Sequence, residues 1–247
     1  MKQLALIAVL ASGLLSAAFT QEKELNGDEI LKKVDDVLYA SKDKDMQVRF
    51  VLIDKNGKES VRDMVTLEKG PDKRLMKFTA PADQKGIGFL SLPDEVMYVY
   101  LPAFGKTRRI ASHVKNTKFA GTDLTYENLE AKRYSDSWNA KLTSQDSEFY
   151  VLELAPKPKT VTDYSKLMVK VKKGDFLAVK IDYFDKSGTN CKTMDRGKFE
   201  KYGNYWEATE SVMTDLKEQH KTKLIMSAIK HDTNIPDDKF SERYLMR

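Results

Sequence analysis

The stretch Leu101–Leu129, LPAFGKTRRIASHVKNTKFAGTDLTYENL, is irregular in period yet rich in aromatic and cationic residues, and we expect the fold to be organised around it. It follows an apolar run, Val96–Leu101, whose β-branched and aromatic residues are typical of a β-strand. Pro102 and Gly105 then interrupt the extended pattern, and a short helix is predicted at Leu124–Leu129. The segment is therefore predicted to leave a strand, pass through a polar loop and end as a short helical cover.

Most of the remaining chain is divided by tight turns into short apolar segments that we predict to be strands. Asn56-Gly57 is a strong hairpin signal, and Gly70-Pro71 and Gly203-Asn204 mark further turns. Strands joined by short turns pair antiparallel. The pattern predicts ten or eleven strands with two or three helices and no strand–helix–strand alternation. The expected fold class is therefore mainly β, an antiparallel sheet with peripheral helices in a single domain.

An amphipathic helix is predicted just before the first strand. Ile30, Leu31 and Val34 recur at helical spacing, and Asn26 or Asp28 is the candidate cap. This helix either packs on the sheet or closes one end of a cavity, and both roles are compatible. A second short helix is predicted at Lys239–Leu245.

The N-terminus has the pattern of a secretory signal peptide. Met1-Lys2 is followed by an apolar core, Leu4–Leu15, and by the small residues Ser16-Ala17-Ala18. The apolar run is shorter than the roughly 20 residues that span a bilayer, so a membrane anchor is the weaker interpretation. We expect residues 1–18 to be removed and residues 19–247 to form one soluble periplasmic domain that does not span a membrane.

Composition excludes several classes of function. Lys and Arg number 42 and Asp and Glu 37, a mixed surface rather than the concentrated basic patch that nucleic acid requires. The single cysteine, Cys191, cannot form an internal disulfide. His113, His220 and His231 lack metal-ligand spacing, so we expect no metal and no cofactor. No catalytic motif occurs, and we expect a protein that is not an enzyme, although a carboxylate pair assembled by the fold would be invisible in sequence.

The pattern Leu-Pro-Ala-x-Gly-x-x-Arg-Arg-Ile, followed by Phe-x-Gly-Thr-Asp-x-x-Tyr-x-x-Leu, resembles the outer-membrane lipoprotein-sorting proteins, relatives of the periplasmic lipoprotein carrier LolA. A supporting match, Ile-Pro-Asp-x-x-Phe-Ser-x-x-Tyr-Leu, lies at 235–245. The resemblance implies an open, curved antiparallel sheet, or unclosed β-barrel, whose concave apolar face is covered by helices. It also implies a carrier that shields the acyl chains of lipoproteins or related lipids. An inner-membrane exporter and an outer-membrane acceptor would be its partners.

The cover segment and its strand supply the candidate ligand-binding residues. Val96–Leu101 is apolar on both faces, so each face needs a cover, which is either the 101–129 segment or a ligand. The apolar candidates for the cavity and its lid are Met97, Tyr98, Tyr100, Phe104, Phe119, Leu124, Tyr126 and Leu129.

A charged latch is predicted beside these apolar residues. Adjacent strand residues point to opposite faces, so one of Arg108 and Arg109 is expected to point inward, with Arg109 preferred. That guanidinium would bond to Asp123 or Glu127, to helix-end carbonyls or to an anionic head group, and the alternative is that both arginines are ordinary surface charges. The alternative for the whole chain is an adaptor, in which the sheet is filled by its own side chains and docks on a membrane export complex.

Overall fold

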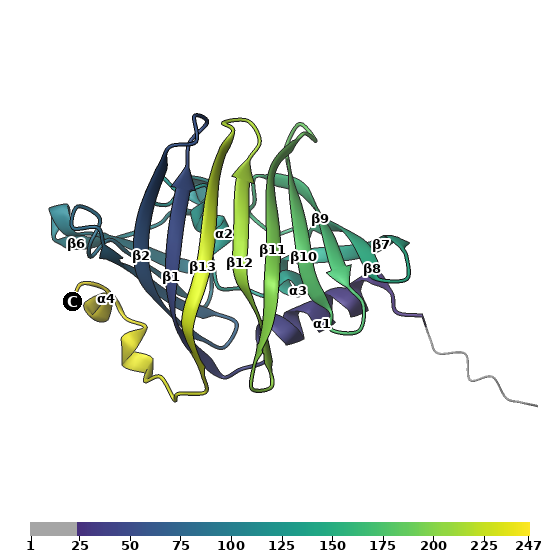
Figure 1. Ribbon diagram of the computed structural model, residues 1–247, viewed down its shortest axis with the longest axis horizontal. Helices are drawn as coiled ribbons and strands as arrows, with labels where there is room; N and C mark the ends of the chain where they lie inside the picture. The colour runs from purple at the N-terminus through teal and green to yellow at the C-terminus, as the bar shows by residue number, and fades with distance from the viewer. Residues whose placement is uncertain (1–23) are drawn as a thin grey trace, which may run out of the picture.

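The computed structural model describes residues 24–247, so the predicted signal peptide at residues 1–18 lies outside the described residues. The described chain forms one antiparallel sheet that is not closed into a barrel (Figure 1). Its strands lie in the order β6-β5-β4-β3-β2-β1-β13-β12-β11-β10-β9-β8-β7. Because β13 pairs with both β1 and β12, the C-terminal strand joins the two halves of the sheet.

Thirteen strands form the sheet, where the sequence predicts ten or eleven. The difference includes β6, a short edge strand inside the stretch predicted as a loop. The strands are β1 Asp43–Ile53, β2 Glu59–Lys69, β3 Lys73–Ala80, β4 Gly88–Leu92, β5 Val96–Leu101, β6 Lys106–Arg109, β7 Trp138–Gln145, β8 Phe149–Pro156, β9 Tyr164–Lys172, β10 Leu177–Asp185, β11 Asn190–Tyr202, β12 Tyr205–Asp215 and β13 His220–His231.

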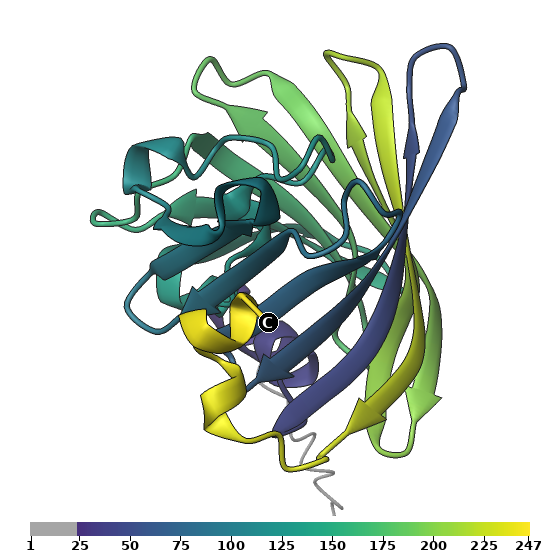
Figure 2. The ribbon, with the colours of Figure 1, turned by 90° about the vertical axis from the view of Figure 1, so that its left-hand side faces the viewer.

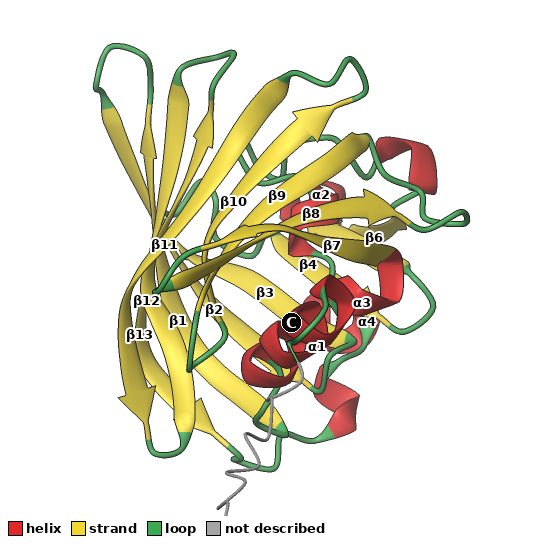
Figure 3. Cartoon of the chain, turned by 90° about the vertical axis from the view of Figure 1, so that its right-hand side faces the viewer, coloured by secondary structure: helices red, strands yellow, loops and turns green. Residues whose placement is uncertain are grey.

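Four short α-helices accompany the sheet: α1 Gly27–Leu38, α2 Tyr126–Leu129, α3 Tyr134–Ser137 and α4 Glu242–Leu245. The sheet curls strongly, and α1, α2 and α3 lie within its curve, whereas α4 packs on the outer side of β4 (Figures 2 and 3). This arrangement confirms the predicted open antiparallel sheet with helices over its concave face.

The predicted N-terminal helix is confirmed as α1, and its sequence explains its position. Asn26 caps it, since its side chain accepts the N–H of Glu29 while the Glu29 carboxylate accepts the N–H of Asn26. Ile30, Leu31 and Val34 are buried in the main core. Gly27 lies so close to β7 that a Cβ there would collide with the carbonyl oxygen of Ala140. Only glycine permits this contact, which holds α1 against the sheet edge.

Two hydrophobic cores occupy the two faces of the sheet. The larger one fills the concave side, and the smaller one lies on the outer side beneath the C-terminal segment. Strand β5 contributes to both, because Met97 and Val99 enter the larger core while Tyr98 and Tyr100 pack against the smaller one. The doubly apolar strand is therefore covered on both faces by the protein itself.

Helix boundaries differ from those predicted. The helix predicted at Lys239–Leu245 is α4, Glu242–Leu245, the one predicted at Leu124–Leu129 begins at Tyr126, and a further short helix, α3 Tyr134–Ser137, precedes β7. The buried carboxylate of Asp35 accepts the backbone N–H groups of Tyr134 and Ser135 at 2.9 and 2.8 Å. These contacts at the start of α3 come from a helix distant in sequence, so no local pattern signals them.

Candidate functional site

A cavity of about 270 Å³ lies between the concave face of the sheet and the elements that cover it. Its wall comes from β1–β3, the start of β7 and β9–β13, and its cover comes from α1, α2, α3, the segment that joins α2 to α3, the turn at Glu95 and the loop before β9. The apolar part of the wall includes Leu38, Met46, Val48, Phe50, Met76, Leu124, Leu129, Trp138, Leu167, Ile181, Met194, Trp206, Leu224 and Met226. Most of these side chains come from strand positions that alternate with outward-facing residues, as expected for one face of a sheet.

Ion pairs are built into one part of this wall. Lys44 Nζ lies 2.7 Å from Glu207 Oε1, and Arg74 Nε lies 2.7 Å from Glu68 Oε1. Arg74 also donates to the carbonyl oxygen of Leu129 at 2.8 Å, which ties the cover to β3. Although burial opposes the charged form of Glu68, Arg74 and Lys44 hold the pKa of this carboxyl below its ordinary value. The Arg74–Glu68 pair therefore stays ionised and ties β3 to the cover where the sheet meets α2.

The cover segment fills the neighbouring part of the concave face. Phe119 is fully buried, and its ring stacks on Phe78 with centroids 5.5 Å apart and an interplanar angle of 8°. Phe89 and Tyr126 pack around the same ring with centroids 6.0 and 5.9 Å away. This aromatic cluster, Phe78, Phe89, Phe119 and Tyr126, occupies space that the curved sheet would otherwise enclose.

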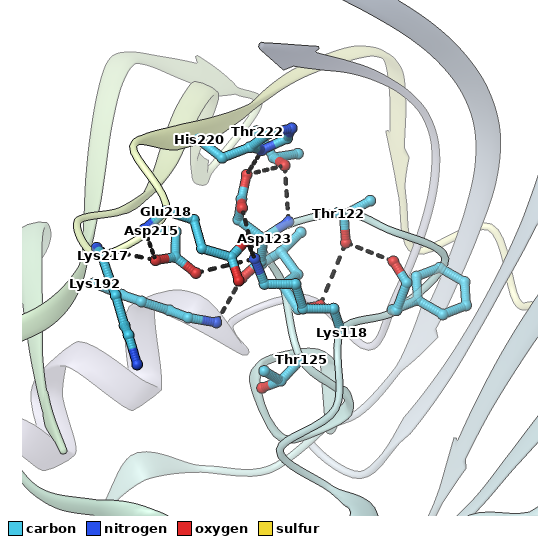
Figure 4. Close-up of polar contacts among 12 residues, drawn as sticks. Lys118, Thr122, Asp123, Thr125, Lys192, Asp215, Lys217, Glu218, His220 and Thr222 are labelled. Atoms are coloured by element: carbon cyan, nitrogen blue, oxygen red, sulfur yellow. Dashed lines mark hydrogen bonds and ion pairs between the residues drawn. The ribbon is translucent and has the colours of Figure 1, made fainter. Parts of the chain in front are cut away.

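A polar network around Asp123 fixes the cover segment to the opposite half of the sheet (Figure 4). One carboxylate oxygen accepts the Thr222 hydroxyl proton at 2.7 Å and lies 2.7 Å from His220 Nδ1. The backbone N–H of Asp123 donates to the Thr222 hydroxyl at 2.9 Å. Lys192 Nζ donates to the Asp123 carbonyl oxygen, also at 2.9 Å. The segment is thus held by β11 and β13 at both its side chain and its backbone.

Lys118 extends this network to the turn after β12. Its ammonium lies 3.4 Å from Asp123 Oδ1 and 3.0 Å from Asp215 Oδ2, and it also pairs with Glu218. Burial opposes the charged form of Lys118, but the three carboxylates outweigh it and raise its pKa. The buried carboxylate of Asp123, which is 0% exposed, is therefore fully partnered.

The predicted ligand-binding residues divide into three groups in the structure. Leu124 and Leu129 line the cavity. Phe119 and Tyr126 lie in the aromatic cluster, and Met97 is buried in the same core.

The other three predictions are corrected. Tyr98 and Tyr100 point to the outer face, because they alternate with the inward-facing Met97 and Val99. Phe104 is 56% exposed, because it lies in the turn before β6 at the edge of the sheet.

The predicted arginine latch is also corrected. Both Arg108 and Arg109 are exposed, and neither pairs with Asp123, whose partners are Lys118, His220 and Thr222. Directly opposed residues share a face, so Arg108, opposite Val99, is on the concave side, and the preference for Arg109 was wrong. Arg108 stays exposed because β6 is the edge strand, where its guanidinium stacks 4.5 Å from the Phe104 ring centroid.

Sequence reasoning missed the charged residues of the cavity wall, most notably Arg196. On β11 it follows Met194 by two positions, so both point to the concave face and both line the cavity. This spacing, which places an arginine on the same face as an inward methionine, was the available signal in the sequence.

Among residues 24–247, no group of His, Cys, Asp or Glu side chains is arranged to hold a metal ion. No helix in the same described range is long and apolar enough to cross a membrane.

Comparison with known proteins places this architecture among solved structures. A family model described as "Uncharacterized protein" matches residues 70–247. A structure described as an outer membrane lipoprotein-sorting protein domain from Vibrio parahaemolyticus is 25% identical, with a TM-score of 0.81 over 90% of this chain and 98% of that one. A DUF1329 family protein from Desulfovibrio piger is 27% identical, with a TM-score of 0.83 over 89% and 97% of the two chains.

A LolA superfamily protein from Nitrosomonas europaea shares the fold at 22% identity, with a TM-score of 0.76 over 90% of this chain and 100% of that one. No curated protein matches the sequence. The resemblance to the outer-membrane lipoprotein-sorting proteins, predicted from the central motif, is confirmed by these structural similarities.

Proposed function

The chain belongs to the family whose model matches residues 70–247, and we propose that it is a periplasmic carrier that binds the acyl chains of lipoproteins or related lipids in its cavity. The observation that carries this proposal is the cavity itself, a hollow between a curved sheet and its cover in which apolar side chains lie beside charged ones. The similarity to a structure described as an outer membrane lipoprotein-sorting protein supports the same function.

The physical task of such a carrier is to remove acyl chains from water. Each buried CH₂ contributes about 0.8 kcal/mol, so a chain of moderate length is held without any covalent chemistry. Met46, Met76, Met194 and Met226 all line the cavity. Methionine is unbranched and polarisable, and it packs against guests of differing shape. Binding rather than catalysis is therefore the proposed activity.

The proposed route of the cargo follows from the proposed location of the protein in the periplasm, between the inner and outer membranes. The mature domain, residues 19–247, would receive its cargo from an inner-membrane exporter and pass it to an outer-membrane acceptor. The signal-peptide pattern at residues 1–18 supports export of the chain across the inner membrane.

Lipid analysis of the protein purified from the periplasm tests this proposal. We expect organic extraction and mass spectrometry to yield an acylated species in stoichiometric amount, and the delipidated protein to bind a fluorescent fatty alcohol at one site. A protein that carries no lipid and binds no such probe would contradict the carrier function and favour an adaptor whose sheet is filled by its own side chains.

A further inference from the structure

The guanidinium of Arg196 lies in the cavity wall, close enough to Glu68 for their charges to attract, but Glu68 forms its ion pair with Arg74. Arg196 comes from β11 and stands opposite Ser211 of β12, which also lines the cavity. Within residues 24–247, no hydrogen bond, ion pair or ring contact involves its side chain. An unpaired charge that is partly removed from water is costly unless something binds to it.

The other charged groups of the cavity wall are engaged. The ion pairs are Lys44 with Glu207, Arg74 with Glu68, Lys132 with Glu95, Arg133 with Asp36 and Lys115 with Glu130. The side chain of Thr162 and the backbone of Asp163 lie beside Glu127 and oppose the rise that burial causes in its pKa. Arg196 is therefore the cation of this wall that remains available for an anion.

Unsatisfied hydroxyl groups provide a second, independent indication of a polar ligand. The side chains of Thr66 and Ser137 line the cavity and are more than nine-tenths buried, with relative exposures of 3% and 5%. Neither Thr66 Oγ1 nor Ser137 Oγ has a hydrogen-bond partner among the residues that the structure describes. Buried polar atoms are nearly always hydrogen-bonded in native proteins, so two unsatisfied hydroxyls in one cavity wall require an explanation.

We propose that Arg196 binds an anionic head group, a phosphate or a carboxylate, while the acyl chain of the same molecule lies along the apolar wall. The inference rests on the proposed function and narrows its cargo to anionic amphiphiles. A guanidinium suits either anion, because its planar fork donates two parallel hydrogen bonds to the oxygens of one group.

The surroundings of Arg196 favour an anion. Burial raises the pKa of Tyr134, and burial likewise raises the pKa of Tyr183 well above its ordinary value. Both phenols therefore stay neutral at physiological pH and bring no negative charge that would repel the ligand. The nearby carboxylate of Glu68 is already neutralised by Arg74.

Competition between amphiphiles of one chain length tests the inference. Dodecyl phosphate, dodecanoate and dodecanol would each compete, below their micellar concentrations, with a neutral fluorescent probe bound to the mature protein. We expect at least one anion to bind about tenfold or more tightly than dodecanol, as hydrogen bonds to charged groups allow. The ratio of the affinities for dodecyl phosphate and dodecanoate then shows whether the head group is a phosphate or the carboxylate of a fatty acid.

Variants assign the preference to one side chain. In Arg196→Met the anions should bind with about the same affinity as dodecanol. Arg196→Lys should retain part of the higher affinity for the anions, because a point charge still attracts an anion. Arg109→Met is the matched control, since Arg109 is exposed on the edge strand, and it should keep the wild-type preference. Circular dichroism would verify that each variant is folded.

Two results would overturn the head-group inference. If the wild type binds dodecanol as tightly as both anions, or if Arg196→Met retains the preference, Arg196 does not recognise the cargo. In both cases bound dodecanol still supports the proposed carrier. If none of the three amphiphiles displaces the probe, the carrier function fails and the head-group inference fails with it.

Discussion

The two halves of the concave face bury charge in opposite ways. On the covered half, the carboxylate of Asp123 is bonded to Thr222, His220 and Lys118. On the hollow half, the half-buried guanidinium of Arg196 borders the cavity and makes no hydrogen bond or ion pair with the described residues. A buried charge whose bonds are all made within the chain is satisfied by the fold itself. A charge without such bonds is a candidate for contact with a ligand.

Packing differs in the same way between the halves. The aromatic cluster around Phe119 leaves its ring fully buried, whereas Met194, Met226 and their neighbours border about 270 Å³ of space. The cover segment thus completes one half of the core and leaves the other half hollow. The predictions below test whether this division is real, beginning with the largest expected effect.

Truncation of Phe119 should have the largest effect on stability. Phe119→Ala removes a ring packed against Phe78, Phe89 and Tyr126, and we expect a loss of about 3–5 kcal/mol in the free energy of unfolding. Met226→Ala on the hollow half should cost clearly less, because its side chain already borders open space. Urea denaturation measures both values, and equal losses would mean that the two halves are packed alike.

Neutralising the two buried charges should give unequal results. Asp123→Asn removes the buried carboxylate that accepts from Thr222 and contacts His220 and Lys118, and we expect a loss of about 2–3 kcal/mol in the free energy of unfolding although Lys118 keeps Asp215 and Glu218. Arg196→Met breaks no bond within the described chain and should leave stability unchanged or raise it. Urea titrations of both variants provide the measurement, and a larger loss from Arg196→Met would remove the distinction between the two charges.

The partly buried carboxyl of Glu127 should make stability depend on pH. Burial raises the pKa of Glu127, so the folded protein holds this proton more tightly than the unfolded chain. The resulting stability is fully present below the ordinary glutamate pKa and is lost as the pH rises through the raised value. As the pH rises from acidic to neutral, the free energy of unfolding of Glu127→Gln should therefore increase relative to that of the wild type in parallel urea titrations. A constant difference across this range would show that Glu127 does not titrate abnormally.

The smallest effect is expected at the edge of the sheet. Arg108→Leu and Arg109→Leu remove exposed side chains from β6, and each should change the free energy of unfolding by less than about 0.5 kcal/mol. Binding of a neutral lipid probe should also stay at the wild-type level. A marked loss of binding in either variant would restore the arginine latch predicted from sequence.

The comparison of the two halves also shows which features a sequence can predict. Alternation and turn residues define β5 to the residue, and the spacing of Ile30, Leu31 and Val34 with the cap at Asn26 defines α1. These features depend on neighbours in the chain. The partners of Asp123 do not, because Thr222 and His220 follow it by about a hundred residues and meet it only through the order of the strands.

The prediction that one arginine of the pair points inward and forms a latch was wrong for a related reason. The sequence shows that Arg108 and Arg109 point to opposite faces, but it does not show that their strand lies at the edge, where the cover ends. Arg196 illustrates the converse, since its position two residues from Met194 was visible while its place inside a cavity required the curvature of the whole sheet. Edges and hollows are properties of the assembled sheet, so local patterns cannot reveal them.

Filling the hollow tests the central claim most directly. Leu224 lies in the cavity wall on β13, and its neighbour Lys223 points to the opposite face. Binding of a fluorescent fatty alcohol should be stoichiometric in the wild type, should fall at least about tenfold in Leu224→Trp as the indole occupies the space of the guest, and should persist in Lys223→Trp. If Leu224→Trp folds and binds the probe as tightly as the wild type does, the cavity is not the place where this protein holds an acyl chain.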